Sequence, residues 1–218
     1  MAEQITRDHS HRVSLNLNHC FSNWRGKVLF LAIDPDVKEN YPEMEELYKI
    51  AAEAHNKNIE TLYPDAGFDL FSPKEVVRRS TRPEISTIKI DFGVKCAMFK
   101  EMFVSNQDTE SLELCLNNPV GYYMYNRSSN SKKSFRLANS VGIIDSGYRG
   151  NLMGYFDINT NYGTSNREEV YECILNKGDR IIQLCSGSLE PFKVAVVENI
   201  EIFGSTERGE GGFGSTGI

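Results

Sequence analysis

Apolar and polar positions alternate through most of this chain in the short runs that are typical of β-strands. Residues 28–33 (VLFLAI) form a continuous apolar run, which predicts a buried strand, and residues 88–94 alternate in the manner of a strand with one buried face. Turn-forming Asn, Gly, Ser and Pro residues separate the other candidates. At a spacing of roughly ten residues they predict an all-β sandwich, barrel or jelly roll. The further candidates are residues 112–116, 121–125, 151–158, 170–175, 180–185 and 193–203.

One segment breaks this pattern, because residues 42–58 have the periodicity of a helix. Pro42 stands at its first turn and acidic residues follow at once, as the positive end of the helix dipole favours. We expect this helix to pack against the β domain rather than to form a site. Its predicted apolar face consists of Met44, Leu47, Ala51 and Ala54.

The two ends of the chain lack a sustained apolar period. Residues 1–26 are predicted to be a flexible N-terminal arm, in which a His-rich start is better explained as a polar terminus than as a metal site. Residues 27–207 are predicted to form the β domain, with a helical insertion near residues 34–60. Residues 208–218 contain five glycines and are predicted to be a C-terminal lid.

Composition narrows the class of protein. The 218 residues carry a formal net charge of −6, which argues against a protein that coats nucleic acid. The longest apolar run has six residues, whereas a membrane-spanning helix needs about 20. Five widely spaced cysteines without a Cys-x-x-Cys pair predict free thiols and an intracellular protein, cytoplasmic or nuclear.

The charge is unevenly distributed, and its distribution leaves room for an anionic ligand. Residues 34–60 contain eight acidic residues against three lysines, so much of the negative charge belongs to the segment of the predicted helix. Residues 124–150 contain five basic residues and one acid, Asp145. This basic stretch is either a solvated loop or part of a pocket for a small anion.

Several polar segments are candidates for chemistry. Residues 209–214 formally match Gly-x-Gly-x-x-Gly, but a dinucleotide site needs a following helix and only four residues follow. A glycine-rich backbone with Phe213 inside it still fits a lid that grips phosphates and covers a base, with a disordered tail as the alternative. Asp145 lies where a predicted strand enters a turn and is either a turn cap or a general base. Asp69 has the same two interpretations.

Taken together, these segments resemble the trimeric dUTPases, the deoxyuridine triphosphate nucleotidohydrolases. Five motifs occur in the order of that family, and the third and fifth are long enough to be specific by themselves. The resemblance extends from about residue 27 to the end of the chain. The motifs are residues 65–70 (DAGFDL), 127–129 (RSS), 139–150 (NSVGIIDSGYRG), 178–184 (GDRIIQL) and 208–217 (RGEGGFGSTG).

The resemblance implies a dUTPase-like jelly roll or β-barrel with one added helix, assembled as a homotrimer with active sites between subunits. It implies hydrolysis of dUTP to dUMP and pyrophosphate, which keeps uracil out of DNA and supplies dUMP. Asp145 would activate a water for attack on the α-phosphorus. Asp69 would hold Mg²⁺ through coordinated water, which suits an ion that keeps much of its hydration.

The resemblance also assigns the substrate contacts. Arg127 and Ser128 would contact the β-phosphate side, Gln183 the α-phosphate, and Arg208 with Ser215 and Thr216 the γ-phosphate. Ser129 also belongs to the predicted substrate-binding set. The uracil edge would meet Asn139 and the backbone of Gly142, Ile143 and Ile144. Tyr148 would pack on the deoxyribose and exclude a 2′-hydroxyl, and Phe213 would cover the base. Met153 and Gly214 complete the predicted substrate-binding set.

Two departures from the family pattern and two alternative functions bear on this prediction. The family often has glycine where Ser129 stands and an acid where Gly147 stands, and neither position is the proposed catalytic carboxylate. A dCTP deaminase shares the fold, but its family carries a glutamate in the stretch that reads NLMGYF here, at residues 151–156. A nucleotide sensor that uses the same pocket is the other alternative. The presence of both Asp69 and Asp145 argues against it, because a pure sensor need not keep both.

Overall fold

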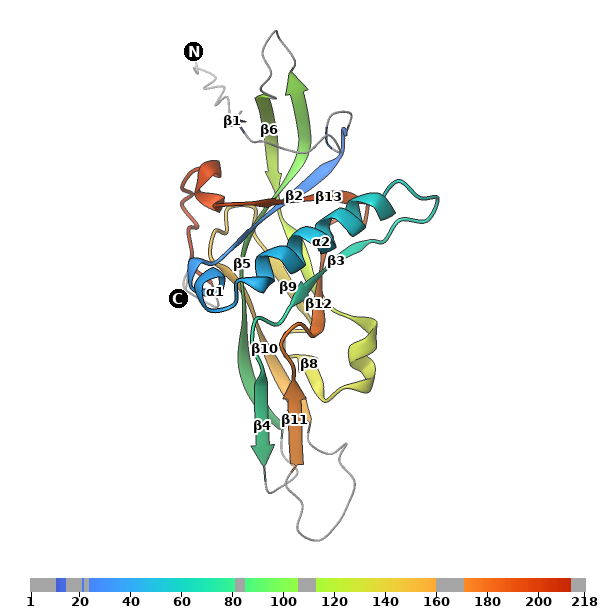
Figure 1. Cartoon of the computed structure of the whole chain (residues 1–218), viewed down its shortest axis with the longest axis vertical. Coiled ribbons are helices and arrows are strands. Elements are labelled where there is room, and N and C mark those ends of the chain that lie inside the picture. The colour runs from blue at the N-terminus through green and yellow to red at the C-terminus, as the bar shows by residue number, and fades with distance from the viewer. Residues whose placement is uncertain are drawn as a thin grey trace, which may run out of the picture.

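The computed structural model describes residues 11–14, 21, 24–80, 85–105, 113–159 and 171–212. Within these ranges the chain is built mainly of strands, as predicted (Figure 1). The largest sheet has seven strands, in which β1-β6-β5-β10-β8 form one path and β2 joins β13 to β5. These strands are β1 (His11–Ser14), β2 (Lys27–Ile33), β5 (Ile85–Ser105), β6 (Glu113–Val120), β8 (Phe135–Leu137), β10 (Asn151–Asn159) and β13 (Phe192–Val197).

A four-stranded sheet faces the large one and carries most of the motif residues. Its order is β3-β12-β7-β9, so β9 is an edge strand. A separate antiparallel pair joins β4 (Val76–Ser80) to β11 (Tyr171–Leu175). The strands of the four-stranded sheet are β3 (Gly67–Phe71), β7 (Tyr122–Asn126), β9 (Val141–Ile144) and β12 (Arg180–Ser186).

The hydrophobic core lies between these two sheets. The large sheet and the four-stranded sheet both contribute fully or almost fully buried apolar side chains to one continuous cluster. Burying each such side chain contributes about 1.5–3 kcal/mol, so this contact is what makes the two sheets one unit. This architecture confirms the predicted all-β, jelly-roll-like fold. Representative members of the cluster are Leu29, Phe92 and Phe156 from the large sheet, and Leu70, Met124 and Leu184 from the smaller one.

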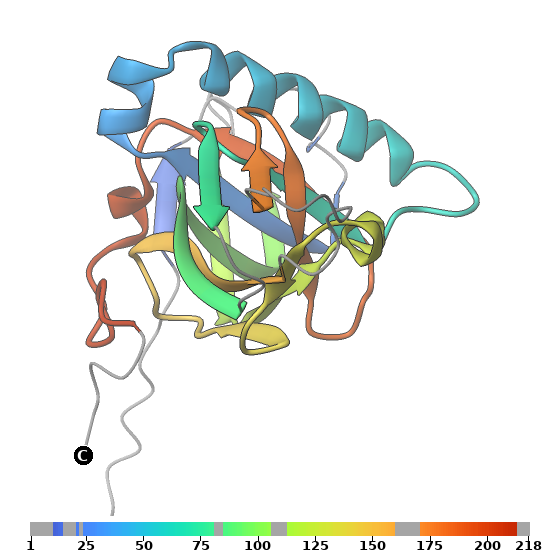
Figure 2. The ribbon, with the colours of Figure 1, turned by 90° about the horizontal axis from the view of Figure 1, so that it is seen from below.

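The predicted helix exists as α2 (Glu43–Asn58), and it lies along the outside of the strands (Figure 2). Met44, Tyr48 and Ala52 form its buried face, and Leu47 packs partly against the same core. Ala54 is exposed, so its placement on the buried face was wrong. The buried stripe instead follows positions four residues apart, Met44, Tyr48 and Ala52, which lie on one face of a helix.

Polar groups of α2 also bind the backbone of the sheet. The side-chain amide of Asn56 donates to Val194 O and accepts from Val194 N, both at 2.8 Å, as a neighbouring strand would. Phe71 N donates to the Tyr48 hydroxyl at 3.0 Å. Since β13 pairs only with β2 among the described strands, the helix covers the edge that β13 would otherwise expose.

Two local elements differ from the prediction. A short helix, α1 (Pro35–Asn40), follows β2, because the Asp34 carboxylate caps it by accepting from Asp36 N at 3.0 Å. The strand predicted for residues 193–203 ends as β13, and Ile200–Phe203 is a 3₁₀ turn, η4, that buries Ile200 and Phe203. A run of apolar residues does not by itself distinguish a strand from a buried turn.

The described part of the chain also bears on the earlier expectations for the termini and cysteines. Strand β1 lies within the predicted arm and pairs with β6. Among the cysteines whose side chains the structure describes, Cys96, Cys173 and Cys185 are free and buried. No helix in the described ranges is both long and apolar enough to cross a membrane.

Candidate active site

The turn that follows β9 presents Asp145 at the edge of the four-stranded sheet. Strand β9 pairs with β7 on one side, and no described strand pairs with its other edge. Tyr148 N donates to Asp145 O at 3.0 Å and closes the turn. A Cβ at Gly142 would lie 3.1 Å from both Cβ and Cε of Met124, so a larger residue here would press against Met124. The result is a backbone edge with little side-chain bulk on it.

A cavity of about 160 Å³ lies beside this edge. It brings together eight residues of the predicted site, and four others that sequence reasoning did not assign. The eight are Asn139, Gly142, Ile143, Ile144, Asp145, Tyr148, Met153 and Arg208, and the four are Met124, Leu152, Gly154 and Gly212.

Asp145 stands at the exposed side of this cavity. Its side chain is 57% exposed, and Arg208 Nε lies 3.2 Å from its Oδ2. The same Nε is buried and has no hydrogen-bond acceptor, so the contact is an ion pair whose N–H does not point at the carboxylate. A carboxylate with solvent access and one loosely directed cation can still accept a proton from water.

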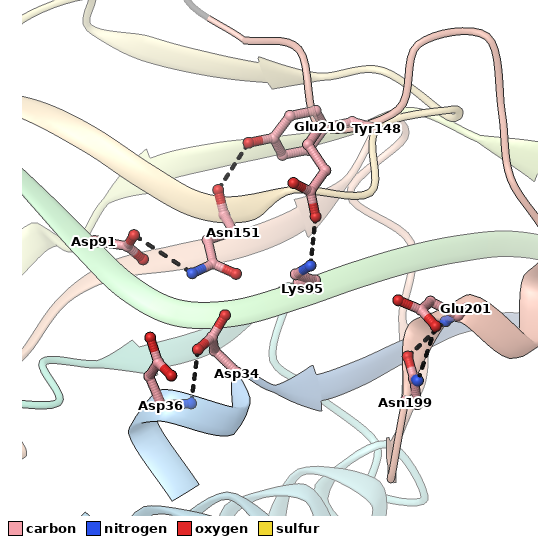
Figure 3. A network of polar contacts seen from close by, with 9 residues as sticks. All are labelled: Asp34, Asp36, Asp91, Lys95, Tyr148, Asn151, Asn199, Glu201 and Glu210. Carbon is pink, nitrogen blue, oxygen red and sulfur yellow. Dashed lines mark hydrogen bonds and ion pairs between the residues drawn. The ribbon is translucent and has the colours of Figure 1, made fainter. Parts of the chain in front are cut away.

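Tyr148 forms the wall of the cavity and is held by hydrogen bonds (Figure 3). Its hydroxyl donates to Asn151 O at 2.8 Å, and the Asn151 side chain donates to Asp91 at 3.4 Å. Burial raises the pKa of Tyr148, so the phenol remains protonated at neutral pH. The ring is therefore a fixed neutral surface.

The C-terminal segment packs against the Asp145 turn through several bonds. Thr206 Oγ1 donates to Gly147 O, and Arg149 N donates to Gly209 O at 2.8 Å. Glu210 pairs with Lys95 of β5 at 2.5 Å (Figure 3). Gly209 adopts a positive φ of 52°, which glycine tolerates best. The predicted lid residues Phe213, Gly214, Ser215 and Thr216 lie outside the described residues.

Asp69 belongs to a second cluster, on β3 and β12. Arg127 Nε lies 2.7 Å from Asp69 Oδ1, and Arg180 Nη1 lies 3.2 Å from Oδ2. The Asp69 side chain is only 20% exposed, and burial raises its pKa more than the two arginines lower it. Gln183 is paired with Asp69 in the β3–β12 register and donates to Asn126 O at 3.3 Å.

The other residues of the second motif follow Arg127 in a 3₁₀ turn, η2 (Ser128–Lys132), which contains Ser128 and Ser129. Asn130 in this turn donates to Ile181 O at 2.7 Å, which fixes the turn to β12. The Arg136 guanidinium donates to carbonyls of the same turn, including Asn130 O at 2.7 Å. The loop is thus rigidly attached beside Asp69.

The structure does not bring the two clusters together within one chain. Tyr122 pairs with Ile144 and Tyr125 with Val141, so Asp145 and Arg127 follow opposite ends of the β7–β9 pair. At about 3.3 Å per residue, the offset of six positions separates their backbones by about 20 Å. The cavity therefore holds the third motif and part of the fifth, while the first, second and fourth motifs meet elsewhere on the surface.

Sequence reasoning missed the residues whose role depends on pairing between strands. Met124 faces Gly142 across β7 and β9, and Gly154 lies where a Cβ would be 2.9 Å from Phe156 Cε2. Arg180 belongs to the fourth motif, but the sequence did not indicate its partner. The pairing of β12 with β3 brings the Arg180 guanidinium to Asp69. Within the described ranges, no three His, Cys, Asp or Glu side chains gather into a metal-binding cluster.

The solved structures that this chain matches include phage dUTPases. A dUTPase of Staphylococcus bacteriophage 80alpha with dUPNHPP has 24% sequence identity and a TM-score of 0.36, covering 73% of this chain and 90% of that one. A mutant dUTPase from phage phi11 of S. aureus, described with a coordinated structural Mg(II) ion, has 22% identity and a TM-score of 0.36, covering 58% and 78%.

Curated relatives are closer in sequence. A Cutibacterium acnes deoxyuridine 5'-triphosphate nucleotidohydrolase is 36% identical over 99 residues, which are 45% of this chain and 58% of the relative. The enzyme of the same name from Paramecium bursaria Chlorella virus 1 is 46% identical over 78 residues, 36% and 47% of the two chains. The chain thus spans about half the length of these relatives. The sequence profile of the dUTPase family matches residues 98–217, more than half of the chain, and the chain therefore belongs to the dUTPase family.

Proposed function

We propose that this protein hydrolyses dUTP to dUMP and pyrophosphate, and that it thereby keeps uracil out of DNA and supplies dUMP. The observation that carries this proposal is the cavity beside the free edge of β9, with the exposed Asp145 carboxylate on its rim. Membership of the dUTPase family supports the same reaction.

The cavity fits recognition of a uracil base. An edge strand offers backbone N–H and C=O groups in alternation, which match the acceptors and donor on the uracil edge. Asn139 adds a side-chain amide, and Met124 beneath Gly142 limits the depth of the cavity. Tyr148 then packs on the deoxyribose, where the fixed ring leaves no room for a 2′-hydroxyl.

In the proposed reaction Asp145 accepts a proton from a water molecule while the water oxygen forms a bond to the α-phosphorus. The bond from that phosphorus to the oxygen between the α- and β-phosphates breaks, and pyrophosphate leaves with the electron pair. General-base assistance of this kind contributes about 10²–10⁴-fold in rate. In the structure Arg208 pairs with Asp145. When dUTP binds, its γ-phosphate would compete with Asp145 for the Arg208 guanidinium.

The phosphates are proposed to bind the second cluster and the lid. Arg127, Ser128 and Ser129 form a basic and hydroxyl-rich loop that is already fixed to β12, and Gln183 lies beside it. The predicted lid residues Phe213, Gly214, Ser215 and Thr216 would cover the base and the γ-phosphate. Met153 lies in the cavity wall and completes the set.

Mg²⁺ fits this arrangement as an ion carried on the substrate. The chain offers Asp69, whose two oxygens each contact one arginine, Arg127 or Arg180. A carboxylate has about four acceptor sites, so about two remain for metal-bound water. When bound, Mg²⁺ neutralises charge on the phosphate oxygens. Titrating EDTA into the assay tests this: activity should fall and return with added Mg²⁺, and full activity in EDTA would contradict it.

We further propose a homotrimer with active sites shared between subunits. One chain keeps Asp145 and Arg127 about 20 Å apart along the β7–β9 pair, so a single triphosphate at one site needs the two clusters from different copies. The proposed divisions of the chain remain an arm (1–26), a β domain (27–207) and a lid (208–218). Light scattering after size exclusion should give three times the mass of the 24.7 kDa chain.

A panel of dUTP, dTTP, UTP and dCTP tests the function. Pyrophosphate release should be about 100-fold faster, as kcat/KM, with dUTP than with the other three. Release of ammonia from dCTP would indicate a deaminase instead. Tight binding of dUTP without turnover would indicate a nucleotide sensor, and comparable turnover of UTP would contradict the role given to Tyr148.

A further inference from the structure

Arg149 is a buried cation next to the Asp145 turn, and no carboxylate pairs with it in the described part of the chain. The residue is 9% exposed. Its Nε is buried without a hydrogen-bond acceptor, and burial lowers its pKa. Burying a charged group without an opposite charge is costly, so the fold must gain something from the contacts that this guanidinium does make.

Those contacts all converge on the backbone that carries Asp145. Arg149 Nη1 donates to Ser146 O at 3.0 Å and to Tyr148 O at 2.9 Å. The backbone N–H of the same residue donates to Gly209 O at 2.8 Å. One residue therefore binds both the turn after β9 and the C-terminal segment that brings Arg208 to Asp145.

The space behind the turn is open rather than packed. A second cavity of about 370 Å³ borders Arg149, with Lys95, Thr206, Gly209 and Glu210 also on its walls. Groups that line a cavity have fewer protein atoms to pack against on that side. Hydrogen bonds to the turn carbonyls, from Arg149 to Ser146 O and Tyr148 O and from Thr206 to Gly147 O, therefore restrain the turn there.

We propose that Arg149 is a positioning residue for the reaction: its guanidinium holds the Ser146 and Tyr148 carbonyls so that the Asp145 carboxylate keeps its place on the cavity rim, and its backbone couples that turn to the docked C-terminal segment. The inference rests on the proposed function, because it assigns Arg149 a part in the same hydrolysis. Arg149 itself does not touch the substrate in this scheme.

Lys193 provides a matched contrast. It is also a buried cation, 4% exposed, but it lies away from Asp145 and pairs with Glu60 at 3.5 Å, with its ammonium 5.2 Å from the centre of the Trp24 ring. Removing its charge disturbs the fold without touching the Asp145 turn. Lys193→Met therefore measures what loss of a buried cation does by itself.

The test compares Arg149→Met, Arg149→Lys and Lys193→Met with the wild type. In Arg149→Met, kcat for dUTP should fall about 100-fold, as a shift of about 1 Å in a reacting group can cause. The Kd of a dUTP analogue with an imido bridge between the α- and β-phosphates should stay near the wild-type value. Arg149→Lys keeps a donor on a similar stem, so it should recover about tenfold of the lost kcat. Lys193→Met should lower the melting temperature but keep kcat near the wild-type value.

Other outcomes overturn the proposal. Unchanged kcat in Arg149→Met, a parallel weakening of analogue binding with kcat retained, or an equal loss of kcat in Lys193→Met would each do so. If Arg149→Met does not fold, Arg149→Lys decides, because wild-type kcat in that variant contradicts the need for the guanidinium. Amide exchange gives a readout without turnover: residues 146–149 should exchange faster in the Arg149 variants and not in Lys193→Met.

The activity of the wild-type protein distinguishes failure of the proposed function from failure of the role proposed for Arg149. Failure of the wild-type protein to hydrolyse dUTP would remove the proposed function. Wild-type hydrolysis that is insensitive to the Arg149 variants would remove only the role of Arg149.

Discussion

The two aspartates at the centre of the proposed site have opposite surroundings. Asp145 is more than half exposed and has one ion pair, to Arg208, in which the N–H points elsewhere. Asp69 is mostly buried, and each of its oxygens contacts a different arginine. The two aspartate side chains are chemically identical, so the difference between them comes from their neighbours and their exposure to solvent.

In the proposed mechanism, this difference distinguishes a carboxylate that reacts, Asp145, from one that organises its surroundings, Asp69. A carboxylate that takes a proton from water needs access to that water, and Asp145 has it. Asp69 is tied to Arg127 and Arg180 in a fixed geometry, which suits a group that arranges cations around phosphates. The strand register places the two on different parts of one chain, so the comparison can be tested cluster by cluster.

Asp145→Asn should have the largest effect. Removing the proton acceptor while keeping size and polarity should lower kcat by about 10³-fold and leave binding of the imido analogue nearly unchanged. Steady-state kinetics and calorimetry would measure the two quantities. Asp157→Asn is a matched control, because that carboxylate accepts from Thr87 Oγ1 at 2.7 Å on the large sheet, away from the cavity. Equal activity of the two variants would contradict the role given to Asp145.

Arg127→Met should act on binding rather than on turnover. Loss of a charge-assisted phosphate contact should raise the KM for dUTP by roughly 10–100-fold, with a smaller effect on kcat. Arg180→Met is the comparison, since it also removes a cation from Asp69 but from a more exposed position.

Mixing the two impaired types of chain, assayed at dUTP concentrations well below the raised KM of Arg127→Met, tests whether the clusters combine across subunits. Arg127→Met and Asp145→Asn chains, unfolded and refolded together, should regain about a quarter of the wild-type activity, because a quarter of the sites then pair two intact clusters. No recovery in the mixture would show that each chain uses its own two clusters.

Tyr148→Ala should change selectivity more than rate. Without the fixed ring, the ratio of kcat/KM for dUTP over UTP should fall by about tenfold, since steric rejection of one hydroxyl is worth at most about 100-fold. Tyr148→Phe is the control, because it keeps the ring and removes only the bond to Asn151 O. Unchanged selectivity in Tyr148→Ala would move the sugar contact to another residue.

The smallest expected effect is the pH dependence of the free energy of unfolding, through His55 on the Asp69 side of the molecule. Burial lowers the pKa of His55 of α2, whose Nε2 lies 2.9 Å from Phe192 O, while Asp65 and Asp69 partly oppose the shift. The unfolded state then binds the proton first, so the free energy of unfolding should fall as pH drops below about 6.5, by at most about 1.4 kcal/mol per pH unit. Urea unfolding of His55→Gln should show a shallower dependence between pH 7 and 5. An identical pH dependence in His55→Gln and the wild type would show that other groups cause the loss of stability.

Much of this protein could be predicted from local patterns. The apolar run at residues 28–33 became β2, and the helical periodicity near residues 42–58 became α2. Both signals are strong because they repeat over several residues. The short helix α1 and the turn η4 were missed, because their formation depends on a cap at Asp34 and on burial of Phe203 rather than on periodicity.

The sequence by itself determined the fold class and the chemistry that the motifs offer, because periodicity and residue type are properties of neighbours along the chain. Eight predicted site residues line one cavity, which agrees with that chemistry. Only the tertiary structure decided that Asp69 lies between two arginines, that Asp145 and Arg127 follow opposite ends of a strand pair, and that Arg149 holds the Asp145 turn. These contacts join residues far apart along the chain or depend on backbone direction, and strand register and burial set both.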